Sequence, residues 1–174
     1  MRIFAVVFVL VSWLAVERAH ACGFWSMTDT EKQLTIGWLV NSASIEKGDK
    51  RWAALYLDID NPSGIRVAKD HKVVYDVKKD GTVVRYGKPI GKVTADGVTF
   101  GKRAYSIALT DHQVQDTVMH TWTLTVKRGD DVVVTSKLAA GLCNAMKHDS
   151  TEDSAAEEVR RRVIYYLAWR ETGL

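Results

Sequence analysis

TVMHTWTLTVKRGDDVVVTSK, residues Thr117–Lys137, is the stretch that decides the fold expected for this chain. Its first arm has one mainly apolar side and one mainly polar side: Val118, His120, Trp122, Leu124 and Val126 alternate with Met119, Thr121, Thr123, Thr125 and Lys127. Successive strand side chains point to opposite faces, so this alternation predicts a strand with one buried face. Gly129 permits a tight turn and Val132–Val134 start a return arm, which predicts a β-hairpin. An isolated hairpin is marginal in water, so we expect a sheet around it.

Turn signals recur on the N-terminal side of this hairpin. Glycines stand near positions 48, 64, 81 and 97, several of them beside Asp, Asn or Pro. Between them, strands are expected over residues 34–41, 52–59, 64–68, 72–78, 82–86, 90–94, 98–100 and 103–109. The spacing predicts a mainly β (α+β) fold, an antiparallel meander of about eight to ten strands. Alternation is the same in a β-sandwich and in a barrel, so both architectures remain open. Residues 26–33 are expected to be a polar lead-in and residues 46–50 a turn.

The period of the apolar residues changes after Lys137. Leu138, Leu142 and Met146 have helical spacing, which predicts a short helix over residues 138–147. A second helix is expected over residues 152–171, because Ser154 and Glu157 have the spacing of a capping box. Its predicted ion pairs are Glu157 with Arg161 and Glu158 with Arg162. We expect these two C-terminal helices to pack on a face or an open edge of the β-rich part, residues 34–137.

Residues 1–21 have the pattern of a secretory signal peptide. Arg2 precedes fourteen mostly apolar residues, and Ala19-His20-Ala21 forms a small-x-small cleavage site. The predicted mature chain is therefore one domain, residues 22–174, exported to a periplasm or the outside of the cell. It keeps 22 basic and 20 acidic residues, which predicts no strong attraction to nucleic acid. No later stretch has the length of a transmembrane helix.

The mature chain has two cysteines, Cys22 at its first position and Cys143 near its end. An even pair in an oxidising compartment predicts a disulfide bond. Closing a loop of this size would stabilise the fold by about 4 to 5 kcal/mol in the chain-entropy model. The alternative is a lipid anchor on Cys22, because a cysteine directly after the cleavage site is what such anchoring requires.

Catalytic motifs are absent from the sequence, which has no Walker-type loop, HExxH, CxxC or GxSxG. The nearest approach to a catalytic or metal-binding set is Asp111, His112, Asp116 and His120, two imidazoles and two carboxylates close in sequence. His120 shares its strand face with Trp122, so a hydrogen-bonded core histidine is the competing interpretation. We therefore expect a non-enzymatic protein without a cofactor.

Other candidate ligands are more scattered. Asp58 and Asp60 precede an Asn-Pro-Ser-Gly turn, and His148 precedes the last predicted helix, so each could contribute to a cation site. Turn capping and helix capping explain them without a metal. Four tryptophans could line an aromatic groove for a sugar or lipid, or pack in the core: Trp25, Trp38, Trp52 and Trp122.

Gly23-Phe24-Trp25 near the mature start and Thr110-Asp111-His112 later in the chain, followed by a C-terminal helix, resemble the layout of the lipocalin family. Lipocalins have a Gly-x-Trp and a Thr-Asp-Tyr at similar places, so His112 stands where that pattern has Tyr. The resemblance implies an eight-stranded barrel that carries an apolar ligand, with Trp25 closing its floor.

These observations predict an exported envelope protein that acts as a non-enzymatic binding or structural interaction module. Its partner is expected to be another envelope protein or a small ligand. The two alternatives are a lipocalin-like carrier of a small apolar ligand, and a hydrolytic or metal-dependent enzyme that uses the aspartates and histidines of residues 111–120.

Overall fold

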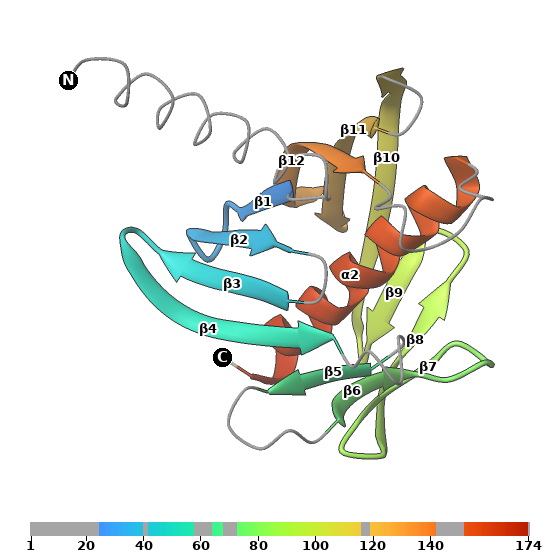
Figure 1. Cartoon of the computed structure of the whole chain (residues 1–174). Helices are drawn as coiled ribbons and strands as arrows, with labels where there is room; N and C mark the ends of the chain where they lie inside the picture. Colours follow the sequence, from blue (N-terminus) through green and yellow to red (C-terminus); the bar gives the residue numbers. More distant parts are fainter. Residues whose placement is uncertain are drawn as a thin grey trace.

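The computed structural model describes residues 25–39, 42–57, 64–67, 73–115, 119–141 and 152–173. Within these ranges the chain forms twelve strands followed by one helix, α2 (Figure 1). The elements are β1 (Trp25–Asp29), β2 (Leu34–Trp38), β3 (Ser42–Lys47), β4 (Lys50–Leu57), β5 (Gly64–Val67), β6 (Val73–Val77), β7 (Thr82–Arg85), β8 (Lys88–Thr94), β9 (Gly97–Phe100), β10 (Arg103–Gln115), β11 (Met119–Arg128), β12 (Asp131–Gly141) and α2 (Glu152–Thr172).

All of the strand pairs are antiparallel, and each strand pairs with the next one along the chain. β1 also pairs with β12, where Thr28 stands opposite Thr135 and Asp29 opposite Val134. The strand order is therefore that of a closed barrel. The prediction of a mainly β, antiparallel fold with a C-terminal helix is confirmed.

The predicted hairpin is β11 and β12. Trp122 stands opposite Leu138 and Leu124 opposite Ser136 across the pair. The inward side chains His120, Trp122, Leu124 and Val126 are buried, as their alternation predicted. β11 also pairs with β10 along most of its length, so the hairpin extends into a long three-stranded segment of the sheet.

The structure corrects the predicted element count. β1 lies largely where the sequence indicated a polar lead-in, and β3 spans residues 42–47, where no strand was predicted, so the strands outnumber the eight to ten predicted. In β1 the buried side chains alternate as Trp25, Met27 and Asp29. The inward-facing Asp29 interrupts the apolar alternation of β1, so the sequence did not indicate a strand there. In β3 the outward positions are occupied by serines, which are not typical strand residues.

The first predicted C-terminal helix, over residues 138–147, is wrong where the structure describes it. Residues 138–141 complete β12, and Leu138 is buried opposite Trp122. An apolar residue followed by two alanines fits either period, so spacing alone could not separate strand from helix. Residues 142–147 lie outside the described ranges.

α2 has the predicted bounds within one residue, but it does not cover an outer face or an edge. Nine consecutive residues, Arg162–Arg170, are buried. A helix packed on one face buries a stripe, whereas burial on all sides requires neighbours all round. α2 therefore lies inside the ring of strands, and its side chains join those of the sheet in one core (Figure 1).

Two further contacts hold α2 in this position. Arg162 donates from Nη1 to the carbonyl oxygen of Leu39 at 2.6 Å, next to the end of β2. Thr172 shares a hydrogen bond of 2.7 Å with the hydroxyl of Tyr75 on β6. Within the described part of the chain, no helix combines the length and apolarity needed to cross a membrane.

Candidate functional site

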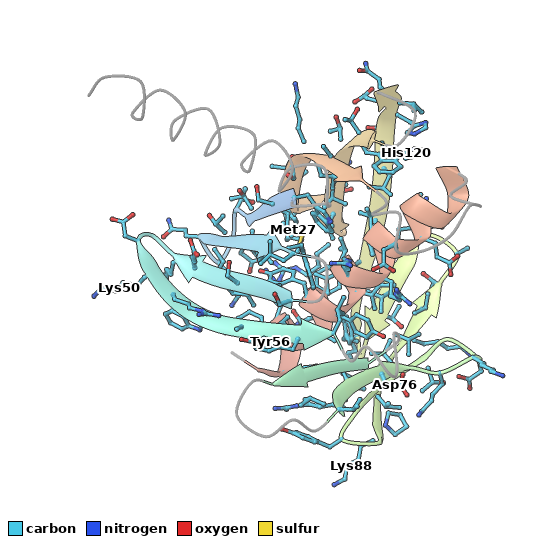
Figure 2. The ribbon with its side chains drawn as sticks, in the orientation of Figure 1. Met27, Lys50, Tyr56, Asp76, Lys88 and His120 are labelled. Atoms are coloured by element: carbon cyan, nitrogen blue, oxygen red, sulfur yellow. The ribbon has the colours of Figure 1, made fainter. Side chains whose placement is uncertain are left out.

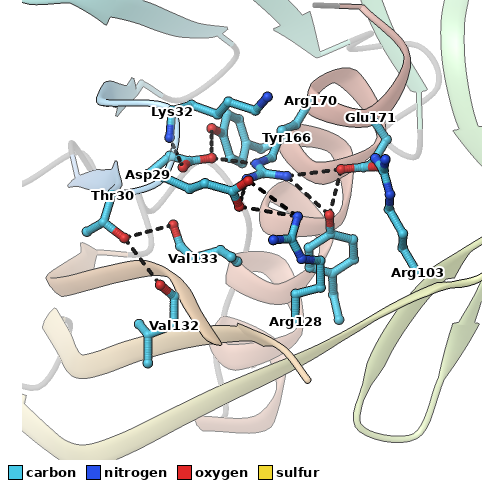
Figure 3. Close-up of polar contacts among 12 residues, drawn as sticks. Asp29, Thr30, Lys32, Arg103, Arg128, Val132, Val133, Tyr166, Arg170 and Glu171 are labelled. Atoms are coloured by element: carbon cyan, nitrogen blue, oxygen red, sulfur yellow. Dashed lines mark hydrogen bonds and ion pairs between the residues drawn. The ribbon is translucent and has the colours of Figure 1, made fainter. Parts of the chain in front are cut away.

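The C-terminal half of α2 carries a buried polar network, drawn in Figure 3. The C-terminal network consists of Tyr166, Arg170 and Glu171 on α2 together with Asp29, Glu31, Arg103, Tyr105 and Arg128 from the strands and turns around them. The side chains of Arg170 and Asp29 are 1% and 0% exposed. Charges at that depth are tolerated only when they are paired and hydrogen-bonded.

Arg170 is the centre of this network. It donates from Nε to Asp29 at 2.6 Å and from Nη2 to Glu31 at 2.7 Å. Nη1 donates to Glu171 at 3.0 Å and to the hydroxyl of Tyr105 at 3.1 Å. Every guanidinium nitrogen therefore has an acceptor, which makes this an oriented, charge-assisted set of hydrogen bonds.

Asp29 is equally well supplied with donors. Its Oδ1 accepts from the backbone N–H of Lys32 at 2.8 Å, and its Oδ2 accepts from the hydroxyl of Tyr166 at 2.7 Å as well as from Arg170. Burial and the hydrogen bond to Asp29 raise the pKa of Tyr166 far above its usual value, so this tyrosine stays a donor.

The acidic members at the edge of the network stay ionised. Burial alone would raise the pKa of Glu31, but the hydrogen bond and charge of Arg170 outweigh it, and the pKa is lowered. Burial also acts against ionisation of Glu171, yet hydrogen bonds from Tyr105 and Arg103 lower its pKa. Burial and the hydrogen bond to Glu171 raise the pKa of Tyr105 to about 12.

The charges of the C-terminal network cancel, because three carboxylates face three guanidinium groups. Arg103 reaches Glu171 at 2.5 Å, and Arg128 reaches Glu31 at 3.3 Å. Every charged group has a partner of opposite sign, so little binding capacity remains for a ligand. The arrangement fits a structural clamp that fixes α2 inside the ring.

A pocket of about 360 Å³ lies beside the N-terminal half of α2. Its apolar wall is formed by Val77, Val93, Ile107 and Ile164, from β6, β8, β10 and α2. The β8–β9 turn with its two flanking residues, residues 94–97, also lines the pocket. Ligand pockets are typically concave and mostly apolar, with volumes of about 300 to 1,000 Å³, so this one has the size and lining of a small-molecule site.

The charges around this pocket are not matched in the way that those of the C-terminal network are. Glu158 forms ion pairs with both Arg161 and Arg162, and its Oε1 lies 2.7 Å from Nε of Arg162. The predicted Glu158–Arg162 pair is thus present, whereas Arg161 pairs with Glu158 and not with the predicted Glu157. Among the described residues, the pocket-lining side chains of Asp96, Glu157 and Arg160 have no hydrogen-bonding or ion-pairing partner.

Two of the four sequence-predicted catalytic residues come together at a β-bulge. Asp111 and His112 together stand opposite Trp122, and Asp111 has a φ of +55°. A bulge changes the direction of the next side chain, and here it turns His112 toward His120. The two imidazoles share a 2.9 Å hydrogen bond between Nε2 of His112 and Nδ1 of His120, and both rings stack on Trp122.

His120 is buried and lies near the start of β11 (Figure 2). Asp111 is exposed, and its carboxylate accepts a hydrogen bond from the neighbouring Thr110 at 3.3 Å. Within the described ranges, no three His, Cys, Asp or Glu side chains gather in a way that could hold a metal ion. The predicted end of this strand at residue 109 was too early, because β10 continues past the bulge to Gln115.

The four candidate tryptophans do not form a common groove. Trp25, Trp38 and Trp122 are buried, and Trp25 stacks on Trp38 with ring centroids 5.8 Å apart. Trp52 alone among the four is exposed, at 55%, with the ammonium group of Lys47 5.3 Å from its ring centre. Tyr56 is also exposed on this strand, β4 (Figure 2).

Several predicted residues lie outside the described ranges. These are the signal peptide, Cys22 and Cys143, the cation candidates Asp58, Asp60 and His148, and the fourth catalytic candidate, Asp116. The described parts of the neighbouring strands β1 and β12 do place Trp25 and Gly141 toward the same end of that strand pair.

The chain matches no protein-family model, no curated protein sequence and no solved structure at a significant level. The lipocalin resemblance therefore has no support from these comparisons. The ring of twelve strands also differs from the eight-stranded barrel that the resemblance implied, and α2 occupies the space where a lipocalin would hold its ligand.

Sequence reasoning did not identify the pocket residues Asp96, Glu157 and Arg160. Asp96 was read only as part of a turn, and Glu157 only as a capping and pairing residue. Glu157, Arg160, Arg161 and Ile164 follow the i, i+3, i+4, i+7 spacing that places side chains on one helix face. That spacing was visible, but nothing in the sequence indicated which strands lie opposite.

Proposed function

We propose that this protein is an exported, non-enzymatic binding module of the cell envelope, which holds a small amphipathic ligand in the pocket between α2 and the β8–β9 turn. The barrel serves as a rigid scaffold around α2. The observation that carries the proposal is the combination, within one pocket, of an apolar wall and unpartnered charges of both signs.

The filled interior argues against a carrier that encloses its ligand. Tyr165, Tyr166 and Leu167 are fully buried among the inward side chains of the strands. The polar groups at the C-terminal half of α2 are occupied with one another. A ligand therefore finds suitable unpartnered groups beside the N-terminal half of α2, and not within the core.

The arrangement of the histidines also favours binding over catalysis. A general base must reach a substrate proton within hydrogen-bond distance. The facing nitrogens of His112 and His120 are instead bonded to each other, and the carboxylate of Asp111 bonds to its neighbour Thr110. The hydrogen bond between the imidazoles and their stacking on Trp122 fit a structural role at the bulge.

Native mass spectrometry of protein purified from its own cells tests the proposal. We expect an added mass that is lost under denaturing conditions. Ala95→Trp, placed on the pocket rim, should lose this mass. Ala104→Trp, at an alanine on β10 that is also exposed but lies outside the pocket lining, should retain it. A ligand-free wild type, or retention of the same mass by both variants, would refute the proposed site.

The same spectra test the export proposal. Export with signal cleavage and a disulfide bond predicts a chain that begins at Cys22 and is two hydrogens lighter than the reduced form. A lipid-sized addition to Cys22 would instead establish the anchored alternative. A chain that retains residues 1–21 would contradict cleavage.

A further inference from the structure

We infer that the pocket selects an ampholyte: a small molecule with one ammonium and one carboxylate group on an apolar body, as in a free α-amino acid with a large apolar side chain. This inference rests on the proposed function, since it names the ligand class of the same pocket.

The charge pattern of the pocket is the first step. Arg161 is held by Glu158, so its charge is already compensated. Among the described residues, two carboxylates, Asp96 and Glu157, and one guanidinium, Arg160, line the pocket without a partner. The unmatched set therefore contains both signs and carries a net charge of about −1 at neutral pH.

These charges come from two different elements that line the pocket. Asp96 belongs to the β8–β9 turn, and its backbone carbonyl accepts a hydrogen bond of 2.8 Å from the N–H of Ile107, which fixes the turn against β10. Glu157 and Arg160 lie one helical turn apart on α2. A ligand seated between the turn and the helix would contact both carboxylate-bearing elements and the guanidinium.

Ligands of one charge type fit this pattern poorly. A simple anion would meet two carboxylates, and a simple cation would leave Arg160 without a partner. A neutral apolar molecule would remove water from all three charges without replacing its hydrogen bonds, which is costly. An ampholyte supplies an ammonium with three donors for the acids and a carboxylate that can accept two hydrogen bonds from Arg160.

The remaining surface of the pocket accounts for the apolar body. Ile164 is only 7% exposed, and Val77, Val93 and Ile107 complete an aliphatic wall. A volume of about 360 Å³ is near the lower end of the range for small-molecule sites. This favours a molecule the size of a single amino acid, which carries an ammonium and a carboxylate on the same carbon.

Isothermal titration of the purified mature protein with L-leucine and L-phenylalanine tests the inference. The matched probes are N-acetyl-L-leucine, which lacks the ammonium group, and L-leucinamide, which lacks the carboxylate. We expect both amino acids to bind and each blocked probe to bind about three- to tenfold more weakly. Blocked probes that bind as tightly as leucine, or amino acids that do not bind, would overturn the inference.

Variants assign each charge to its ligand group. Asp96→Asn and Glu157→Gln should weaken the binding of L-leucine but change the binding of N-acetyl-L-leucine little. Arg160→Gln should weaken the binding of L-leucine but change the binding of L-leucinamide little. Glu46→Gln and Arg51→Gln, a facing pair of exposed residues on β3 and β4, are the controls and should change neither affinity. Equal effects of pocket and control variants would overturn the assignment.

Failure of the inference differs from failure of the proposed function. If the ligand found by native mass spectrometry is not an ampholyte and Ala95→Trp still removes it, the pocket stands and the ligand class is wrong. If Ala95→Trp and Ala104→Trp retain the same ligand, the pocket itself is wrong.

Discussion

The two halves of α2 differ in whether their most prominent charged side chains have partners of opposite sign. In the C-terminal half, Arg170 is 1% exposed at its side chain and bonds to four partners. In the N-terminal half, Arg160 and Glu157 are exposed and, among the described residues, bond to none. One helix thus carries a compensated ionic cluster at one end and uncompensated charges beside an apolar pocket at the other.

This difference separates residues that hold the fold from residues that are available to a ligand. Removing one partner of a buried pair leaves an uncompensated charge in a poorly solvated place, whereas an exposed charge is stabilised by water with or without a partner. Substitutions in the C-terminal network should therefore change stability, and those at the pocket should change binding. The predictions below follow this order, from the largest effect on stability to the smallest.

Arg170→Met should destabilise the protein by about 3–5 kcal/mol, because it keeps an apolar stem but leaves the buried Asp29 carboxylate without its cation. Urea unfolding followed by fluorescence measures the effect, with Arg160→Met on the same helix as the control. A loss below about 1 kcal/mol would mean that the C-terminal network does not hold α2 in place.

Tyr166→Phe should cost about 1.5–3 kcal/mol, because it removes only the 2.7 Å hydrogen bond to the charged Asp29 and keeps the ring. Tyr56→Phe, at a hydroxyl on an exposed side chain, is the matched control and should be nearly neutral. Equal unfolding free energies for the two variants would contradict the role given to Tyr166.

The decrease of the unfolding free energy at acid pH should depend on Glu31 and Glu171, whose folded-state pKa values lie below the ordinary value of 4.5. A lowered folded-state pKa gives stability that is present above the unfolded pKa and lost as the pH falls through the folded one. The urea concentration at the unfolding midpoint should therefore decrease as the pH is lowered from about 6 to 3. This decrease should be less steep in Glu171→Gln than in the wild type. An unchanged slope in Glu171→Gln would exclude this linkage, and Glu46→Gln serves as the control.

Tyr105 should make the unfolding free energy fall at alkaline pH, with a dependence on pH opposite in sign to that of Glu31 and Glu171. Its folded-state pKa is raised to about 12, so the unfolded chain ionises first and stability falls as the pH rises from about 10 to 12. Spectrophotometric titration of Tyr105→Phe against wild type should show the loss of one late-titrating tyrosine. An identical titration curve would contradict the raised pKa.

Arg160→Gln should change the unfolding free energy by no more than about 0.5 kcal/mol, as for an exposed side chain without a partner. The same variant should weaken binding of L-leucine. Loss of stability comparable to that of Arg170→Met would show that the two halves of α2 are not different in kind.

The sequence predicted those parts of the fold in which local pattern and burial agree. Alternation identified β11, because every second side chain from His120 to Val126 is buried. It failed at β1, where the third inward position is Asp29. That aspartate is acceptable in the core only because Arg170, 141 residues away in sequence, neutralises it. No local pattern contains that information.

The candidate site was less predictable for a related reason. The bulge at Asp111 moves His112 to the same face as His120, and a strict period of two cannot anticipate one extra residue. Likewise, the pocket depends on which strands surround α2. Val159, Val163 and Tyr166 have the helical spacing of a single packing stripe and are buried, but such a stripe does not reveal that the opposite side of the helix is buried as well.

Amide hydrogen exchange along α2 is the measurement that tests the central claim most directly. If the helix is enclosed and clamped at its C-terminal half, amides of residues 163–170 should exchange only through global unfolding, while those of residues 156–161 exchange faster through local opening. Addition of L-leucine should slow the second group and leave the first unchanged. Equal, fast exchange along the whole helix would contradict a clamped helix inside the barrel.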